Sequence, residues 1–303
     1  MGKGNIDGIG TSQNSTRWYY FLLTVSQVIG IAALIILGVL FGKYRGGFGW
    51  GSDLTKVFNN HPLFMALGMI FFYGDAILVY RVFRDTKKIF VKIIHACLLA
   101  LSLILSSIGL KGVFDSHNRA VPPQDNLVTA HSWIGLTVVI LFGLQWVCGF
   151  ITYLFPKLSE SIRQAYMPSH KFWGKTIFIL AIVAFMMGVV EYSIFDNLYD
   201  DKKLRVHGNT LTVLSIMFLI FAIIVIYLVG DNDFQRPPEN VDEHTPLTDD
   251  NLYNDKKLRV HGNTLTVMSI MFLIFAIIVI YLVGDNDFQR PPENVDEHTP
   301  LTE

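Results

Sequence analysis

The sequence predicts an all-α integral membrane protein, a bundle of helices that cross a bilayer. Of its 303 residues, 51% are hydrophobic and only 16% are charged, which is less charge than soluble domains usually carry. The apolar residues also gather in runs of about 20, the length that crosses the hydrocarbon core of a bilayer as a helix. Backbone in that core must satisfy its own hydrogen bonds, so each span is expected to be helical.

Six apolar runs predict six core transmembrane helices, and a seventh run follows them. We expect spans at about 18–42, 60–80, 93–111, 127–155, 169–193 and 209–229, with the seventh run at 263–283. Aromatic residues such as Trp18, Tyr80 and Tyr153 stand near the ends of these runs, as in interfacial aromatic belts. The first run is too long for the core of a signal peptide, so we expect it to be a span.

The short loops predict the orientation of the bundle. The loop after the second span has five basic residues between 81 and 92 against one acid, whereas the loop at 111–126 is balanced. Basic residues are also in excess between the fourth and fifth spans. Cytoplasmic loops carry the surplus of Lys and Arg, so the second and fourth loops and the N-terminus are expected in the cytoplasm.

Charge and cysteine content exclude several other classes of protein. The net charge is −1, which gives no basic footprint for nucleic acid. The two cysteines, Cys97 and Cys148, lie inside apolar runs and are too few for a disulfide framework or a cysteine-built zinc site. Metal binding would therefore depend on histidine and carboxylate side chains.

The C-terminal part of the chain contains a long repeat. Residues 196–248 recur at 250–302 with two differences in 53 positions: Asp200 becomes Asn254, and Leu214 becomes Met268. Solenoid repeats usually diverge more and need at least three units, so a recent duplication of one terminal segment explains the pattern best. We therefore divide the chain into a transmembrane domain at 1–248 and a repeat at 249–303, whose apolar run would form a duplicated C-terminal span.

Four histidines stand near the start of four successive predicted spans: His61, His95, His131 and His170. Successive spans run in opposite directions, so His61 and His131 are expected near the outer face and His95 and His170 near the cytoplasmic face. Neutral imidazoles suit haem iron, and helix bundles hold such cofactors between facing helices. Small residues nearby (Ala96, Gly135 and Gly174) would let a flat macrocycle approach.

Other uses of these histidines stay open at this point. A lone histidine in a span can hydrogen-bond to a neighbouring helix, although intramembrane ionisable groups are candidates for function. A proton relay could use a similar pattern, as could a metal transporter that binds zinc or iron directly. A seven-span receptor would fit the count of apolar runs, but it would not need four histidines at matched depths.

The predicted cytoplasmic face carries cations close to the inner histidine pair. Lys88 and Lys92 precede His95 by seven and three residues, and Arg163 precedes His170 by seven. Cations of this kind would suit haem propionates or an anionic electron donor. The positive-inside pattern of ordinary membrane proteins would place the same residues there.

Several segments together resemble the cytochrome b561 family, the ascorbate-dependent transmembrane electron carriers of animals and plants. They are YRGG at 44–47, FNNHP at 58–62, LVYRVFR at 78–84, KIIH at 92–95, VFDSHN at 113–118, HSWIG at 131–135 and PSHKFWG at 168–174. The resemblance extends from about residue 18 to about residue 240, and the second copy of the C-terminal segment is outside the family pattern.

The resemblance implies a function and a set of site residues. It implies six helices with a haem-binding four-helix core and two b haems, one ligated by His61 and His131 and the other by His95 and His170. It implies an oxidoreductase that transfers electrons from cytosolic ascorbate to monodehydroascorbate or a ferric chelate across the membrane of an endomembrane vesicle, a lysosome or the cell, as a homodimer. Cofactor contacts are implied for Arg81, Lys88, Asn126, Leu127, Val128, Thr129 and Glu191, and substrate contacts for Lys92, Arg163, His117 and Asn118.

Overall fold

The computed structural model describes residues 7–198 and 204–230, with side chains from residue 16 onward. All regular structure in these residues is helical, and six helices are long and apolar enough to cross a membrane. The all-α class and the six core spans are therefore confirmed. The seventh apolar run and the second copy of the repeat lie outside the described residues, so the duplicated span and the domain boundary at 248 stay predictions.

The first two spans each contain a π-helical segment. Helix α1 (Asp7–Val39) continues into the π-helical turn η1 (Leu40–Tyr44). The second span joins α2 (Leu54–Met65), η2 (Ala66–Phe72) and α3 (Tyr73–Val82) into one rod. Such π-helical insertions shift the register of a helix and occur often at functional sites.

Four uninterrupted helices complete the bundle. They are α4 (Lys88–Asn118), α5 (Ala130–Tyr153), α6 (Glu160–Phe195) and α7 (Arg205–Gly230). Thr129 caps α5 in a capping box with Ser132, which satisfies backbone donors that the first turn leaves open. The Asp53 carboxylate caps α2 by accepting from the backbone N–H groups of Thr55 and Lys56, and the bond from Lys56 holds the pKa of this exposed carboxyl below its usual value.

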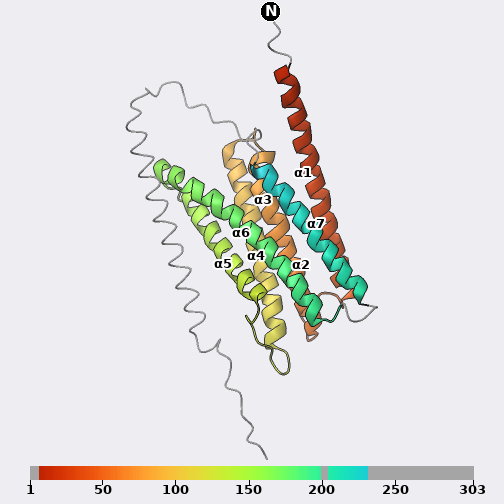
Figure 1. Ribbon diagram of the computed structural model, residues 1–303. Helices are drawn as coiled ribbons and strands as arrows, with labels where there is room; N and C mark the ends of the chain where they lie inside the picture. The colour runs from red at the N-terminus through yellow and green to blue at the C-terminus, as the bar shows by residue number, and fades with distance from the viewer. Residues whose placement is uncertain (1–6, 199–203, 231–303) are drawn as a thin grey trace, which may run out of the picture. The chain divides into compact units, whose positions relative to one another are not determined.

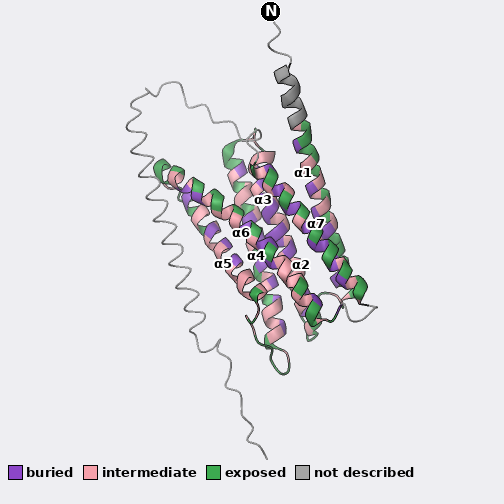
Figure 2. Cartoon of the chain, viewed as in Figure 1, coloured by how far each residue is buried: buried purple, intermediate pink, exposed green. Residues whose placement is uncertain are grey.

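The helices pack mainly in lengthwise pairs. The second span lies along α4, α5 lies along α6, and α1 lies along α7, as Figure 1 shows. Helix α7 also touches α3 and α6, so α1 and α7 cover one side of the four spans that carry the histidines. Buried residues concentrate where these helices meet (Figure 2), and Tyr73, Phe142, Phe178, Phe218 and Phe221 are among the largest fully buried side chains.

Glycines let the second span approach α4 closely. A Cβ added at Gly68 would lie 2.9 Å from the backbone oxygen of Ser102, and one at Gly112 would lie 2.9 Å from that of Val57. Small residues at such contacts are typical of membrane helix pairs, since packing and not water exclusion drives their association. The Ser102 hydroxyl donates to the Gly68 carbonyl, a carbonyl within the π-helical segment.

The helices extend well beyond the apolar runs from which the spans were predicted. Helix α4 begins at Lys88 rather than at 93, and α6 begins at Glu160 rather than at 169. Hydropathy marks only the stretch that suits lipid, whereas a helix continues into the polar interface as long as its backbone is satisfied. The expectation that every histidine lies within the first few residues of its helix is therefore wrong for His61, His95 and His170, and right for His131.

Candidate metal centres

One pair of histidines, His61 and His131, meets at one end of the four-helix bundle. His61 projects from α2 and His131 from α5, and their ring centres are 6.0 Å apart with an interplanar angle of 83°. The Nδ1 of His61 lies 3.1 Å from the carbonyl oxygen of Gly109, and the Nδ1 of His131 lies 2.8 Å from that of Ala184. A carbonyl oxygen can only accept, so each Nδ1 carries the proton and each Nε2 keeps its lone pair.

The second pair, His95 and His170, meets at the other end. His95 comes from α4 and His170 from α6, with ring centres 6.3 Å apart and an interplanar angle of 70°. The Nδ1 of His95 lies 2.7 Å from the carbonyl oxygen of Ala76. The Nδ1 of His170 instead lies 2.9 Å from the side-chain Nε2 of Gln145. The structure thus brings the four histidines together in the two pairs that the alternation of spans predicts.

Glycines leave room for one imidazole of each pair. A Cβ added at Gly188 would lie 2.6 Å from Cε1 of His131, and one at Gly149 would lie 3.0 Å from Cε1 of His170. These glycines were not predicted. The small residues expected near the rings play a weaker part: a Cβ at Gly135 would meet nothing within 4 Å, and one at Gly174 would meet only Gln145 at 3.8 Å. Helix orientation, which sequence does not give, decides which glycine faces a ring.

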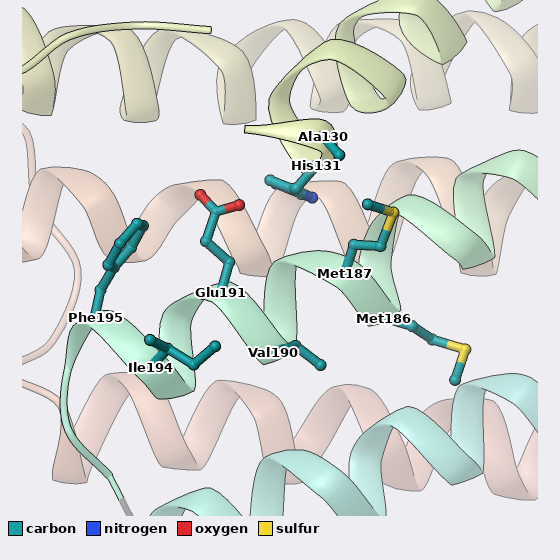
Figure 3. A pocket seen from close by; sticks show the side chains of 8 residues that line it. All are labelled: Ala130, His131, Met186, Met187, Val190, Glu191, Ile194 and Phe195. Atoms are coloured by element: carbon teal, nitrogen blue, oxygen red, sulfur yellow. The ribbon is translucent and has the colours of Figure 1, made fainter. Parts of the chain in front are cut away.

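A pocket of about 430 Å³ opens beside His131. Figure 3 shows its lining, which comes from Ala130 and His131 of α5 and from six residues of α6. Glu191 is the only acidic residue in this lining, and Figure 3 places its carboxylate on the side of the pocket where His131 lies. The remaining lining residues of α6 are Met186, Met187, Val190, Ile194 and Phe195, so the pocket is mostly apolar with one carboxylate at its edge.

Most of the predicted outer-site residues lie around the connection from α4 to α5. His117 and Asn118 form the end of α4 and not a loop, because the helix continues through this segment. The Asn126 amide donates to the Asn118 side-chain oxygen at 2.7 Å, and the His117 carbonyl accepts from the Ala120 and Gln124 backbone at 3.2 and 3.1 Å. These contacts fold the connection back over the helix end.

The last residues of this connection lead directly into His131. Leu127 has a φ of +58°, a left-handed conformation that turns the chain, and Val128 is 68% exposed. Thr129 then caps α5, and His131 is the second residue of the helix. The predicted segment 126–129 thus leads into the first turn of α5, which carries His131.

Two of the cationic residues predicted near His95 and His170, Lys92 and Arg163, are hydrogen-bonded to Tyr153. The Lys92 ammonium donates to the carbonyl of Tyr153 at 3.4 Å, and the Tyr153 hydroxyl donates to the carbonyl of Arg163 at 3.1 Å. The Tyr153 ring centre is 5.4 Å from that of His170. Tyr153, expected only as an interfacial aromatic, therefore connects the Lys92 and Arg163 segments to the inner histidine pair.

Arg81 and Lys88 take different positions near the same end. A guanidinium N–H of Arg81 donates to the carbonyl of Val229 in the last turn of α7, where a cation complements the helix dipole. The preceding residue, Tyr80, has its ring centre 5.4 Å from that of His95. Lys88 is exposed at the first turn of α4, two helical turns from His95.

Comparison with known proteins agrees with this arrangement. The family model of eukaryotic cytochrome b561 matches residues 60–196, a stretch that contains all four histidines. The mouse (Mus musculus) transmembrane ascorbate-dependent reductase CYB561 is 37% identical over 219 residues, which cover 72% of this chain and 86% of the relative. The human (Homo sapiens) protein of the same name is 36% identical over 234 residues, covering 77% of this chain and 91% of the relative.

The chain belongs to the cytochrome b561 family. A further relative is the lysosomal membrane ascorbate-dependent ferrireductase CYB561A3 of zebrafish (Danio rerio), 33% identical over 242 residues that cover 77% of this chain and 97% of that protein. Membership makes this chain a multi-pass membrane cytochrome, and a cytochrome carries haem. It also sets aside the alternatives of a seven-span receptor and a metal transporter.

The histidine pairs fit a metal held between two imidazoles. Bonds from a metal to an imidazole nitrogen are about 2 Å long, and a ring centre lies about 1.1 Å from its nitrogens, so opposed ligands have ring centres roughly 6 Å apart. The observed separations are 6.0 and 6.3 Å. Across the described parts of the chain no group of three or more His, Cys, Asp or Glu residues could hold a bare metal ion. Pairs at this spacing suit a haem, whose porphyrin supplies the other four ligands.

Proposed function

We infer that this cytochrome b561 is an ascorbate-dependent transmembrane reductase that connects two haem sites at opposite ends of one helix bundle. This inference is based on the two histidine pairs, whose ring centres are 6.0 and 6.3 Å apart. The Nδ1 atoms of His61, His95 and His131 are hydrogen-bonded to backbone carbonyls, which leaves each Nε2 available to a metal. Two sites are needed because a span of about 20 residues covers roughly 30 Å, which is too far for one site to serve both faces.

We propose that His61 and His131 hold the outer haem and that His95 and His170 hold the inner one, within a core formed by the second to fifth spans. When bound, the haems would each accept and release one electron. The protein contributes rigid ligands: three of the four rings are fixed by backbone carbonyls of a neighbouring helix, which sets both their rotation and their tautomer. A haem held by two imidazoles would have no free position for oxygen and would supply electron transfer.

We propose that ascorbate binds at the cytoplasmic end, close to Lys92 and Arg163. Ascorbate is an anion at neutral pH, and ammonium and guanidinium groups are the usual partners of such oxygen anions. The Tyr153 backbone and ring link these two cationic segments to His170. Lys88 and Arg81, at the entrance of α4 and the end of α3, add positive charge to the same face.

We propose that the acceptor binds at the outer end, near His117, Asn118 and the segment 126–129. The acceptor is monodehydroascorbate or a chelate of ferric iron, and the name of the zebrafish relative favours iron. His117 offers a nitrogen ligand to iron, and the amides of Asn118 and Asn126 offer hydrogen bonds to either acceptor. Glu191, in the wall of the pocket beside His131, would lie at the edge of the outer haem.

The remaining assignments concern the surroundings of the protein. We propose that residues 1–248 form the cytochrome domain, that 249–303 repeat its last segment, and that the protein is a homodimer in its bilayer. The membrane would be an endomembrane vesicle, a lysosome or the plasma membrane, and the lysosomal membrane named for the zebrafish relative supports this range.

A proteoliposome experiment tests the proposal. Purified protein is reconstituted, ascorbate is added on one side, and a ferric chelate or monodehydroascorbate is enclosed on the other. We expect a reduced-minus-oxidised haem spectrum, two haems per chain by pyridine haemochrome analysis, and reduction of the enclosed acceptor. Folded protein without haem, or with a haem that ascorbate does not reduce, would refute the proposal. Comparison of the two acceptors identifies the physiological one.

A further inference from the structure

Gln145 is a buried amide in the middle of an apolar membrane helix. It is 5% exposed and belongs to α5, a span with a mean hydropathy of 2.2. Polar side chains inside spans are costly unless they are satisfied, and they often mark functional positions. Neither the histidine pattern nor the cationic cluster accounts for a glutamine here.

The amide of Gln145 forms hydrogen bonds with His170 and Tyr166 of α6. Its Nε2 donates to the His170 carbonyl at 2.8 Å and lies 2.9 Å from Nδ1 of the same residue. Its Oε1 accepts from the Tyr166 hydroxyl at 3.3 Å. The Tyr166 ring centre in turn lies 5.9 Å from that of His170. Gln145 thus contacts both the backbone and the ring of one histidine.

The other three histidines have a different kind of partner. His61, His95 and His131 each direct Nδ1 at a backbone carbonyl. A carbonyl can only accept a hydrogen bond, so it permits one tautomer, the one whose Nε2 can bind a metal. An amide offers both a donor and an acceptor, so it can hold the ring in either tautomer according to which atom it presents. His170 is therefore the one ligand of the four whose state depends on a side chain.

We propose that Gln145 is a positioning residue for His170: its amide sets the rotation and the tautomer of that imidazole, and so the strength with which His170 binds the inner metal. This inference rests on the proposed function, because it assumes that His170 is a haem ligand. Hydrogen bonds to the outer nitrogen of a ligating histidine orient the ring and tune its basicity, which changes the reduction potential of the metal. Gln145 would in this way set the inner haem apart from the outer one.

Substitutions at Gln145 should move the inner potential in opposite directions. Gln145→Glu keeps the size of the side chain and puts a carboxylate oxygen, an acceptor, in place of the amide Nε2 that faces Nδ1. A better acceptor makes the imidazole more basic, stabilises oxidised iron and lowers the midpoint potential of the inner haem. Gln145→Leu removes both the acceptor and the donor, which weakens the ligand and raises that potential.

Tyr73→Phe, on α3, provides a matched control because Tyr73 also hydrogen-bonds to α6. The Tyr73 hydroxyl donates to the carbonyl of Gly174 at 2.8 Å, one turn beyond His170 on α6. This bond, like that of Gln145, is buried and joins a side chain to the backbone of another helix, but the Tyr73 ring packs against Phe142 and Phe178 and not against a histidine. Its loss should affect the packing of α6 without changing the potential of either haem.

An equilibrium redox titration of haem absorbance in purified protein measures these effects without any need for turnover. The inner component is identified as the one that is lost in His95→Ala. We expect that component alone to shift down in Gln145→Glu and up in Gln145→Leu, and to stay in place in Tyr73→Phe. If the leucine variant does not fold, the near-isosteric glutamate variant decides the matter.

Two other results would overturn the inference. One is an inner component that stays in place in Gln145→Glu, and the other is a shift that Tyr73→Phe reproduces, since this would assign the effect to helix packing. Failure of the proposed function is distinguishable, because the unsubstituted protein would then lack two haems. Two haems in that protein with no shift at Gln145 would refute only the role of this amide.

Discussion

The two ends of the bundle hold their histidines at nearly the same separation but surround them differently. At the end that is predicted to face outward, both rings are fixed by carbonyls, those of Gly109 and Ala184, and the carboxylate of Glu191 lines the pocket beside His131. At the end that is predicted to face the cytoplasm, one ring is held by the Gln145 amide, and Lys92 and Arg163 supply positive charge. The two pairs thus share the spacing of their rings and differ in the groups that contact those rings.

Removal of single histidines should have the largest effect on the two haem sites. We expect His61→Ala and His131→Ala each to remove the outer haem, and His95→Ala and His170→Ala each to remove the inner haem, because one imidazole leaves an axial position open. Pyridine haemochrome analysis should give about one haem per chain in every variant, and the spectral component lost should be the same within each pair. Loss of different components by His61→Ala and His131→Ala would contradict the pairing.

Substitution of the two glycines that face histidine rings should produce the next largest effect. In Gly188→Ala the new Cβ would lie 2.6 Å from the His131 ring, whereas in Gly149→Ala it would lie 3.0 Å from the His170 ring. Overpacking of this kind costs about 1–3 kcal/mol. We therefore expect Gly188→Ala to lower outer-haem occupancy more than Gly149→Ala lowers inner-haem occupancy.

Haem content and thermal denaturation of each variant measure this difference. Gly135→Ala is the control, because a Cβ there meets nothing within 4 Å. Equal losses in all three variants would show that the bundle does not tolerate an extra methyl group at any of these positions, and that ring contact is not the cause.

The sequence predicted the helices and the histidine pairs, and the reason is geometric. Apolar runs of bilayer length and the alternation of span direction are enough to place His61 near His131 and His95 near His170. Helix boundaries were predicted less well, since α4 and α6 begin five and nine residues earlier than the apolar runs. Those extra turns place Lys88, Lys92 and Arg163 on helices and not in loops.

The partners of the histidines could not be predicted from the sequence. Gly109, Ala184 and Ala76 contribute backbone carbonyls, which every residue has, so no side chain marks them. Gly188 and Gly149 depend on how two helices are rotated about their axes. Gln145 carries a readable signal, since a glutamine within an apolar run suggests a buried contact, but its partner becomes evident only from the packing of α5 on α6.

A charge substitution at the inner end should have a moderate effect that is confined to one substrate. Lys92→Ala removes an ammonium group that contacts Tyr153, and we expect the KM for cytosolic ascorbate to rise about tenfold, equivalent to about 1.4 kcal/mol. Haem content and the KM for the outer acceptor should stay unchanged. The rise should diminish with added salt, because opposed charges near a surface are screened.

Lys111→Ala is the matched control for this measurement. Lys111 forms an exposed ion pair with Asp115, at 2.6 Å, near the outer end of α4. Exposed pairs of this type contribute little stability, so the KM for ascorbate should not change. A similar rise in both lysine variants would show that net charge of the protein, and not a site at Lys92, controls the affinity for ascorbate.

Loss of a hydrogen bond that serves packing alone should have the smallest effect. Tyr73→Phe removes the donor to Gly174 between α3 and α6, and such interhelical bonds in membranes contribute about 0.6 kcal/mol on average. We expect a slightly lower temperature of haem release in both spectral components and no change in KM for either substrate. A loss confined to the inner component would mean that this bond also positions His170, and the distinction between Tyr73 as a packing residue and Gln145 as a positioning residue would then fail.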